Sequence, residues 1–478
     1  MATAALAQVE ATVSENPIRV VWALAWPAVA LNSLQVLNTL LDRFFIGHLE
    51  PSALTAQAAS QNVMFLMFSI AAAIGTAATA IVSRSFGAKD VAGYRIGARE
   101  SASVTTIAGF VLAGATALIA PIASHILLPA NDSRSMHLMT GYLTGYAAGL
   151  PAIFVIQTLA GSLRGIGDTK SPMYISGLQI LMHVSLNFLL IFPARNIGGI
   201  RVPGANLGLV GASTALSISS WVAALIYLGF TGRTPLGRLW KMAVPTLEWF
   251  ARIMRIALPA ATMMVLRVFS GVAFTVVLAR VPDASAAIAA MGVGFAIEGI
   301  MYMPSFGLQV AASALVGQSL GMRQPDRAER LGWIAAHHAA LVTLALAVPL
   351  IAWAGPITWL IVGGKQDIAR ESALLLRLLC STEVMFAYSM VLIGAMQGAG
   401  DTVKPMWISV FSMWGLRVPL ALFLALPKGI NLTSWLFLPF GAGLGAAGAW
   451  IAVCLTQAVQ GGLCVWAFRQ GGWKLKRV

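Results

Sequence analysis

The chain contains few charged residues for its length. Asp, Glu, Lys and Arg make up 10% of its 478 residues, whereas hydrophobic residues make up 58%. Globular domains usually carry about 25% charged residues, and so small a share of charge cannot cover the apolar surface of soluble domains. The composition therefore excludes an ordinary water-soluble protein and indicates a chain that is surrounded largely by lipid.

Cysteine is equally scarce, and its positions exclude two kinds of site. The three cysteines, Cys380, Cys454 and Cys464, lie in apolar stretches and form no CxxC pair. This pattern provides neither a disulfide framework nor a metal site. The chain also lacks an HExxH motif, and its apolar runs contain no pair of GxGD aspartates. We therefore expect a protein that is not an enzyme and that holds no cofactor.

Twelve apolar runs are long enough to cross a bilayer as helices. A transmembrane helix needs about 20 apolar residues, and these runs are too long for the roughly ten-residue strands of a barrel. The first run follows 17 residues without a basic region and is longer than a signal peptide, so we expect it to remain as the first span. The expected spans are 18–42, 55–83, 97–124, 138–162, 171–193, 206–230, 253–280, 285–316, 332–354, 371–395, 403–426 and 442–468.

The formal charge of +14 comes from Lys and Arg that are dispersed between the apolar runs, so we expect no nucleic-acid partner. Alternate loops differ strongly in their content of these residues. The set that includes both termini and the stretch 231–256 carries 20 of them, and the other set carries nine. Because positively charged loops stay on the cytoplasmic side, we expect both termini in the cytoplasm.

The two halves of the chain resemble each other. Residues 161–177 align with 394–410 at nine of seventeen positions, and residues 77–90 align with the segment from 311 onward at six of fourteen. The offsets are 233 and 234 residues, and the prolines Pro27 and Pro259 match in the same order. Such regular self-similarity indicates an internal duplication.

The duplication predicts the architecture. Each half contains six spans, and because six is an even number both halves begin on the same side of the membrane. We therefore expect an all-α membrane protein of twelve transmembrane helices, in two six-helix lobes related by a pseudo-two-fold axis along the membrane normal. The expected lobes are residues 1–234 and 235–478, with a cavity between them.

Four motifs carry a resemblance to a known family. They are LLDRFFIGHL (40–49) after a proline in the first span, GSLRGIGDTKSPM (161–173), LVGQSLG (315–321) and GAMQGAGDTVKPM (394–406). Together, in this order and over the whole chain, they resemble the multidrug and toxic compound extrusion (MATE) transporters.

The resemblance implies a monomeric antiporter of a bacterial or archaeal cytoplasmic membrane. It would export amphipathic, often cationic organic compounds in exchange for H⁺ or Na⁺, by alternating access. A flippase for lipid-linked precursors or polysaccharides, from the related superfamily, is the alternative. Such a flippase would carry a basic central cavity, whereas here the spans contain two cations, Arg267 and Arg417, against three acids.

Asp42 is the first candidate for coupling. An acid inside a span costs about 2.5–3.5 kcal/mol on insertion scales and normally marks an ion pathway or a cation partner. Asp42 lies fifteen residues after Pro27, and the resemblance implies that this aspartate accepts the cation or proton of the first lobe. We expect the first helix to bend or repack near Pro27, and Pro259 is its counterpart in the second half. The alternative is that Asp42 pairs with Arg43 or caps the loop at the membrane interface.

His183 and Asn187 are the next candidates, because they stand where the family has an Asn followed by an Asp four residues later. Residues four apart share one helix face. An Asn oxygen can ligate Na⁺ together with Asp42 but cannot exchange a proton, so we expect H⁺ rather than Na⁺ as the coupling ion. His183 would be either a second proton carrier or a hydrogen-bonded residue between helices.

Glu298 and Glu383 are the remaining acids within spans. They are candidates for binding a cationic substrate or a second ion. Some family members have an acid eight residues after the proline of the seventh span, where this chain has Arg267. The alternative is that the two glutamates form buried salt bridges with Arg267 and Arg417.

Overall fold

The computed structural model describes residues 16–129, 131–197, 200–239, 244–433, 436–438 and 440–476. The first half of the chain contains α2 (Pro17–Gly47), α3 (Pro51–Gly87), α4 (Val91–Leu127), α5 (Ser133–Gly165), α6 (Lys170–Leu190), β1 (Pro193–Ile197), β2 (Ile200–Ala205) and α7 (Gly208–Thr231). The second half contains α8 (Leu247–Leu278), α9 (Ala284–Met301), α10 (Met303–Gly321), α11 (Pro325–Ala352), α12 (Ala354–Ile361), α13 (Gln366–Gly398), α14 (Val403–Val410), the π-helix η1 (Phe411–Arg417), α15 (Val418–Ala425), β3 (Ile430–Thr433), β4 (Leu436–Leu438), α16 (Gly445–Arg469) and the 3₁₀-helix η2 (Gly472–Leu475).

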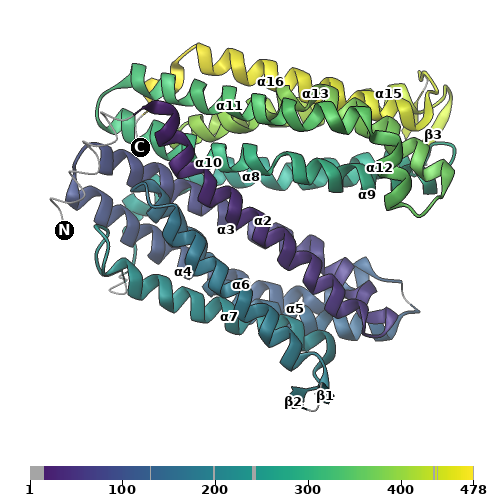
Figure 1. The fold of residues 1–478 in the computed structure, drawn as a ribbon, viewed down its shortest axis with the longest axis horizontal. Coiled ribbons are helices and arrows are strands. Elements are labelled where there is room, and N and C mark those ends of the chain that lie inside the picture. Colours follow the sequence, from purple (N-terminus) through teal and green to yellow (C-terminus); the bar gives the residue numbers. More distant parts are fainter. Residues whose placement is uncertain are drawn as a thin grey trace.

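The prediction of twelve transmembrane helices is confirmed. In the described part of the chain, 12 helical stretches are long and apolar enough to cross a membrane. Figure 1 shows them in two bundles, one for each half of the chain, which meet where α16 ends and diverge toward the opposite end. Two antiparallel hairpins, β1–β2 and β3–β4, are the departures from the all-α expectation.

Two of the expected spans, the eighth and the eleventh, are interrupted. The eighth divides at Tyr302 into α9 and α10, next to Pro304 in the first turn of α10. Proline lacks an N–H and cannot continue the hydrogen-bond ladder of the preceding helix. The ninth is the helix α11, which ends at Ala352 and is followed by the short helix α12. The eleventh contains the π-helix η1. Wider turns of this kind often occur at functional sites, and η1 ends at Arg417.

Polar side chains fix several helix starts. Asp132 accepts a hydrogen bond from the backbone N–H of Ser135, and Asp90 accepts one from Gly93. Such caps satisfy amides that have no partner inside the helix. Hydrogen bonds from the side chain and the amide of Ser135 lower the pKa of Asp132 below its ordinary value. Asp168, in the first GDT motif, caps the start of α6 through the N–H of Ser171 at 2.9 Å.

The first helix of each half packs against the opposite half. Near the start of α2, Val21 and Leu24 belong to a buried cluster with residues of α10, α11, α13 and α16. Near the start of α8, Ile253 and Ile256 belong to a buried cluster with α3, α4 and α5. These two pairs lie 232 residues apart, as Pro27 and Pro259 do. The helices therefore cross between the bundles just before their prolines.

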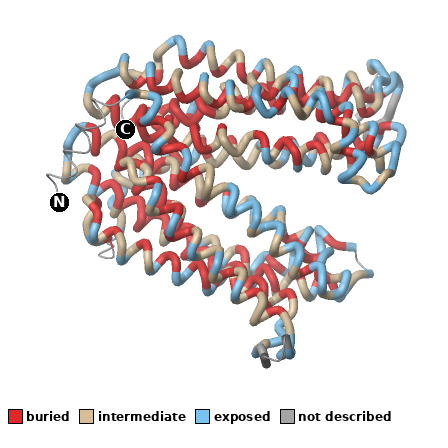
Figure 2. Tube along the Cα trace, in the orientation of Figure 1, coloured by how far each residue is buried: buried red, intermediate tan, exposed pale blue. Residues whose placement is uncertain are grey.

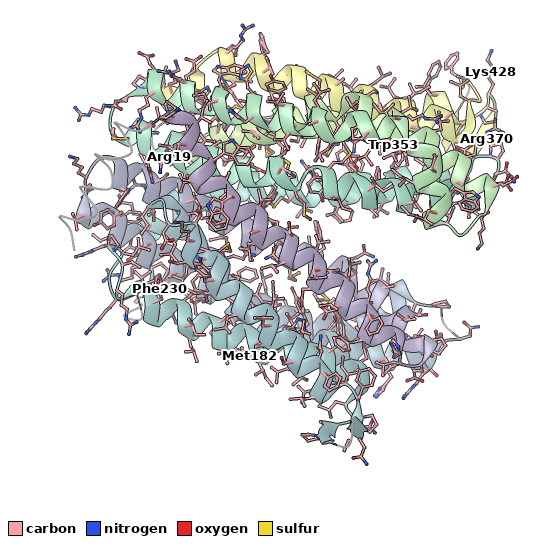
Figure 3. All side chains as sticks on the ribbon, in the orientation of Figure 1. Arg19, Met182, Phe230, Trp353, Arg370 and Lys428 are labelled. Carbon is pink, nitrogen blue, oxygen red and sulfur yellow. The ribbon has the colours of Figure 1, made fainter. Side chains whose placement is uncertain are left out.

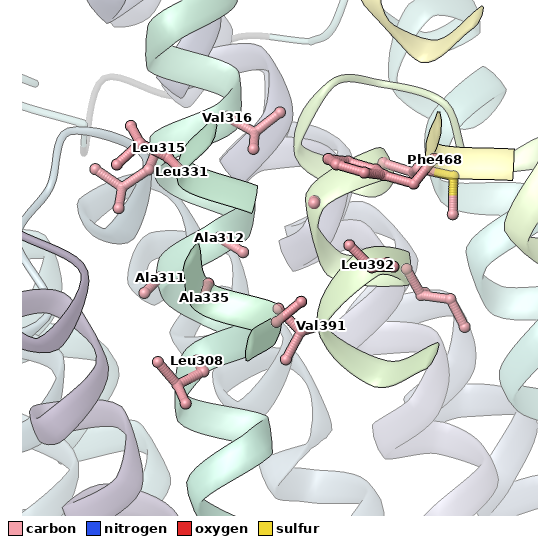
Figure 4. Packing of buried hydrophobic residues seen from close by; sticks show 14 of the residues in the cluster. Leu308, Ala311, Ala312, Leu315, Val316, Leu331, Ala335, Val391, Leu392 and Phe468 are labelled. Atoms are coloured by element: carbon pink, nitrogen blue, oxygen red, sulfur yellow. The ribbon is translucent and has the colours of Figure 1, made fainter. Parts of the chain in front are cut away.

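Buried side chains are concentrated where the bundles meet. Figure 4 shows part of the larger cluster, to which Leu308 and Leu315 of α10 and Val391 and Leu392 of α13 belong. Farther along α2 the side chains become accessible, and Phe44 is 61% exposed. Figure 2 shows the same change, from buried to exposed, along α2 and its neighbours.

Charged residues mark the two ends of the molecule. Figure 3 shows Arg19 at the end where the bundles meet, and Arg370 and Lys428 at the far end of the second bundle. This placement agrees with the assignment of these residues to alternate sets of loops. The orientation of the two ends in the membrane stays a prediction.

Candidate functional site

The structure brings together the three coupling candidates of the first half. Asp42 lies on α2, and His183 and Asn187 lie on α6. Asn187 Nδ2 donates a hydrogen bond of 2.6 Å to Asp42 Oδ1. Asn187 is fully buried, whereas the side chain of Asp42 is 23% exposed. The carboxylate is thus fixed by one helix and still accessible from one side.

His183 approaches the same carboxylate without a hydrogen bond to it. Its Nε2 atom lies 3.8 Å from Asp42 Oδ1, and its Nδ1 atom lies 3.1 Å from Asn38 Oδ1. Asn38 was not among the candidates, although it lies four residues before Asp42 on the same face of α2. The polar spacing of Asn38 and Asp42 is the signal that identifies it.

The alternative partner of Asp42 is not observed. Among the ion pairs of the described residues, none joins Asp42 to Arg43, and the side chain of Arg43 is exposed. Asn187 Oδ1 is buried without a hydrogen-bond partner in this part of the chain. An amide oxygen without a partner next to a carboxylate can ligate a cation. It can also accept a hydrogen bond from the O–H group of a protonated carboxyl. The described residues contain no cluster of three or more His, Cys, Asp or Glu that could hold a metal ion.

The two acids of the second half lie in a different environment. Glu298 of α9 accepts a hydrogen bond from Gln457 Nε2 of α16 at 2.8 Å. Gln457 Oε1 in turn accepts one from Thr382 of α13 at 3.2 Å. Glu383 is 1% exposed, and neither of its oxygens has a hydrogen-bond partner among the described residues. The two glutamates lie within electrostatic range of each other.

Direct salt bridges between these glutamates and the arginines are not observed. Within the described residues, neither Arg267 nor Arg417 has a carboxylate oxygen within 4.0 Å. Arg417 Nε instead donates to Thr456 Oγ1 at 3.2 Å. The side chain of Arg267 is exposed. These cations therefore act on the glutamates only over longer distances.

The two prolines lie inside continuous helices. Pro27 is within α2, and Pro259 is within α8. Each removes one backbone hydrogen bond from its helix, which makes the position easier to bend. The structure shows one conformation, so bending at Pro27 stays a prediction.

A pocket of about 340 Å³ lies between the two halves. It is lined by Ile70 and Ile74 of α3 and by side chains of α8 from Met254 to Leu266. Its wall is apolar apart from Thr262. Pockets of this size accept the apolar part of a small organic molecule.

Comparison with known protein families gives a match to both halves of the chain. The model of the family described as MatE matches residues 27–189 and 259–423. A probable multidrug resistance protein NorM of Thermotoga maritima is 26% identical over 461 residues, which cover 95% of this chain and 93% of that protein. A FAD transporter of Shewanella oneidensis is 27% identical over 351 residues, which cover 72% of this chain and 74% of that protein.

Solved structures share the fold. A crystal structure of MATE in complex with MaL6 superposes with a TM-score of 0.83 at 20% identity, covering 95% of this chain and 96% of that chain. A MOP superfamily transporter from Pyrococcus furiosus, described as having a binding pocket of reverse polarity, gives a TM-score of 0.81 at 20% identity. That match covers 97% of this chain and 98% of the other.

Proposed function

The chain belongs to the MatE family, and from this premise we propose that it is an H⁺-coupled antiporter that exports amphipathic organic compounds. The observation that carries the proposal is the contact between Asp42 and Asn187 across α2 and α6, with a hydrogen bond of 2.6 Å. A carboxylate inside a membrane span is energetically costly, and its presence normally marks an ion pathway or a cation partner. Here it is held in place by a neutral amide and remains partly open.

The choice of H⁺ over Na⁺ rests on the composition of this site. The residue that faces Asp42 is an amide, and its N–H group points toward the carboxylate. The NH₂ group of Asn187, which faces Asp42, cannot ligate a cation, because in an amide only the oxygen offers lone pairs to a metal ion. One carboxylate with a single free amide oxygen is a poor Na⁺ site but a complete proton acceptor. The contact between His183 and Asn38 would hold α6 against α2, so that Asn187 stays opposite Asp42.

During transport the two bundles would move relative to each other. Exchange of the proton on Asp42 and binding of the exported compound would each favour one of two states, open at one end or at the other. Coupling then arises because proton and compound have different affinities for these states. We propose that the segment of α2 beyond Pro27 moves between the two states, because its side chains are no longer part of the buried core that the two bundles share.

The exported compound would bind near the seam between the bundles. The apolar pocket between α3 and α8 offers about 340 Å³ for an apolar body. The relatives named as multidrug resistance proteins support small organic compounds as substrates. A lipid-linked precursor flippase is not favoured, since none of the relatives reported above is named as one. We place the protein in a cytoplasmic membrane, as a monomer with both termini in the cytoplasm.

The proposal is tested with purified protein in liposomes. Ethidium transport is followed under an imposed pH gradient or an imposed Na⁺ gradient. We expect uphill ethidium movement with the pH gradient alone, and its loss in Asp42→Asn. Arg43→Gln is the matched control, because it changes the neighbouring charge and should leave transport intact. Transport that follows the Na⁺ gradient, or full activity of Asp42→Asn, would overturn the assignment.

A further inference from the structure

The six residues after α16, residues 471–476, fold back onto the second bundle, and we call them the strap. Gly471 turns the chain with a φ of 71°, a conformation that glycine adopts readily. Trp473 is then fully buried, and its ring stacks on Phe468 of α16 with the ring centres 4.6 Å apart. Its Nε1 atom donates a hydrogen bond to the carbonyl oxygen of Phe468 at 2.8 Å. The strap is therefore anchored in the core of the bundle.

Two further contacts attach the strap to other parts of the same bundle. Lys474 Nζ donates to Glu329 Oε2 of α11 at 2.5 Å. Lys476 Nζ lies 3.8 Å from Asp401 Oδ1, in the loop between α13 and α14. The strap thus joins α16, α11 and this loop at the end where the two bundles meet.

The first half contains a counterpart of this arrangement. There the segment after α7 returns to α4, because Leu236 and Leu239 belong to a buried cluster with residues of α4. Arg95 Nε of α4 also donates to the carbonyl oxygen of Pro235 at 2.9 Å. Arg95 and Glu329 lie 234 residues apart, at matching positions of the repeat. The attachment of the segment after the sixth helix of each half therefore recurs, although its chemistry differs.

The carboxylate of Asp401 depends on the strap for a cation. Its side chain is fully buried, and Oδ2 has no hydrogen-bond partner among the described residues. In the first half, the matching Asp168 accepts hydrogen bonds from both the amide and the hydroxyl of Ser171. The residue that matches Ser171 is Lys404, whose amide reaches Asp401 only at 3.5 Å. A buried carboxylate without a partner is costly, so Lys476 compensates for the missing hydroxyl.

The loop that the strap holds also contacts the first bundle. Arg84 Nη1 of α3 donates to the carbonyl oxygen of Ala399, within this loop, at 3.2 Å. The helices are tightly packed here, since a Cβ atom on Gly317 of α10 would lie 2.0 Å from Ser83 Oγ of α3 and 2.9 Å from the carbonyl oxygen of Gly398. A displacement of the loop by about 1 Å would break the hydrogen bond from Arg84, because such bonds are lost beyond about 3.5 Å.

We propose that the strap is a conformational device that keeps this end of the molecule closed, by holding the α13–α14 loop where Ala399 accepts the hydrogen bond from Arg84. Lys476 is a positioning residue, because it contacts Asp401 of the loop, and the loop in turn contacts the first bundle. Release of Lys476 frees the loop and raises the population that is open at this end. The inference goes beyond the export function and concerns the balance between closed and open states.

The test measures how often the seam opens in the full chain in liposomes. The reporter is the rate of maleimide labelling at Ser83→Cys, a fully buried position, in protein whose three native cysteines are replaced. We expect Lys476→Gln to raise this rate about threefold, and Lys476→Arg, which keeps the charge, to label as the parent does. Arg469→Gln is the matched control, because Arg469 is an exposed cation at the end of α16. Equal rates in Lys476→Gln and in the parent would overturn the inference.

A double-mutant cycle tests the route through Arg84. Arg84→Gln removes the guanidinium that reaches Ala399 and should raise the labelling rate by itself. If the strap acts through this hydrogen bond, Lys476→Gln should raise the rate much less in the Arg84→Gln background than in the parent. The same fold increase in both backgrounds would contradict the proposed route.

A second reporter separates opening of the seam from general unfolding. Thr231 is fully buried at the end of α7, and we expect labelling at Thr231→Cys to be unchanged by Lys476→Gln. Equal increases at both reporters would show that the strap merely stabilises the fold, and the inference would be wrong. None of these measurements requires transport, so their outcome does not depend on whether the export function is correct.

Discussion

Gln318 of α10 donates a hydrogen bond from Nε2 to the carbonyl oxygen of Gly165, the last residue of α5, at 2.9 Å. The equivalent residue of the first half, Arg84 of α3, donates from Nη1 to the carbonyl oxygen of Ala399, just after α13, at 3.2 Å. Gln318 and Arg84 lie 234 residues apart, at matching positions of the repeat. The two halves therefore close one end of the molecule with a reciprocal pair of hydrogen bonds.

Removing one of these hydrogen bonds should open this end more often. Each such bond contributes about 0.5–1.5 kcal/mol, so we expect Gln318→Ala to raise the open population about two- to tenfold. The reporter is the rate of maleimide labelling at Ser83→Cys, a buried seam position, in protein whose three native cysteines are replaced. Gln470→Ala, at an exposed glutamine, is the control. Equal labelling in both variants would show that the bond does not hold the seam.

Close packing at the same seam gives a second prediction. A Cβ atom on Gly321 would overlap the backbone oxygen of Arg84, and one on Gly87 would overlap the backbone oxygen of Gln318. Backbone atoms cannot move aside as a flexible side chain can. We therefore expect Gly321→Ala to separate the halves and to cost about 1–3 kcal/mol, measured as a lower melting temperature in detergent.

Gly462 provides the matched control for this substitution. It lies within α16, and a Cβ atom there would meet nothing within 4 Å. Since alanine favours helix more than glycine does, Gly462→Ala should leave the melting temperature unchanged or raise it. A similar loss in both variants would mean that the seam is not the cause.

The spans and the repeat could both be predicted from the sequence. The spans follow from the rules that lipid imposes on a crossing helix, and the repeat follows from the similarity of the two halves. Each crossing must satisfy its backbone hydrogen bonds within one helix, so apolar runs identify the spans. The match between the segments at 77–90 and 311 onward predicted equivalent positions, and Arg84 and Gln318 are such a pair. What it could not predict is that they bind across the seam, since this depends on how the bundles approach.

The candidate site was predictable in part. His183 and Asn187 share a helix face by their spacing, but the partner helix followed only from the family resemblance. Asn38 was missed although the same spacing relates it to Asp42. The break at Tyr302 follows from Pro304, which hydropathy alone does not reveal. The π-helix that ends at Arg417 depends on tertiary packing.

His183 provides a prediction that separates its two possible roles. Its ring lies 3.8 Å from Asp42 and 3.1 Å from Asn38, so the geometry favours a positioning role over proton transfer. Glutamine can replace the ring as a hydrogen-bond partner of Asn38, and we expect His183→Gln to keep pH-driven ethidium export within about threefold. His183→Ala loses a buried hydrogen bond and should lower export about tenfold, as expected for about 1.4 kcal/mol.

The comparison of the two variants decides between the roles. If His183→Gln is as inactive as Asp42→Asn, with the protein correctly folded, the ring carries a proton. If even His183→Ala transports at the wild-type rate, the contact with Asn38 does not position the site.

Glu298 links three helices, and its loss should destabilise the second bundle. The chain of hydrogen bonds runs from Thr382 of α13 through Gln457 of α16 to Glu298 of α9. Glu298→Gln retains an acceptor oxygen for Gln457, whereas Glu298→Leu leaves a buried amide N–H without a partner, at a cost of about 1–3 kcal/mol. We therefore expect Glu298→Leu to melt at a clearly lower temperature than Glu298→Gln. If both variants lose stability equally, the negative charge near Arg267 and Arg417 matters more than the hydrogen bond, and if neither does, the bond to Gln457 is dispensable.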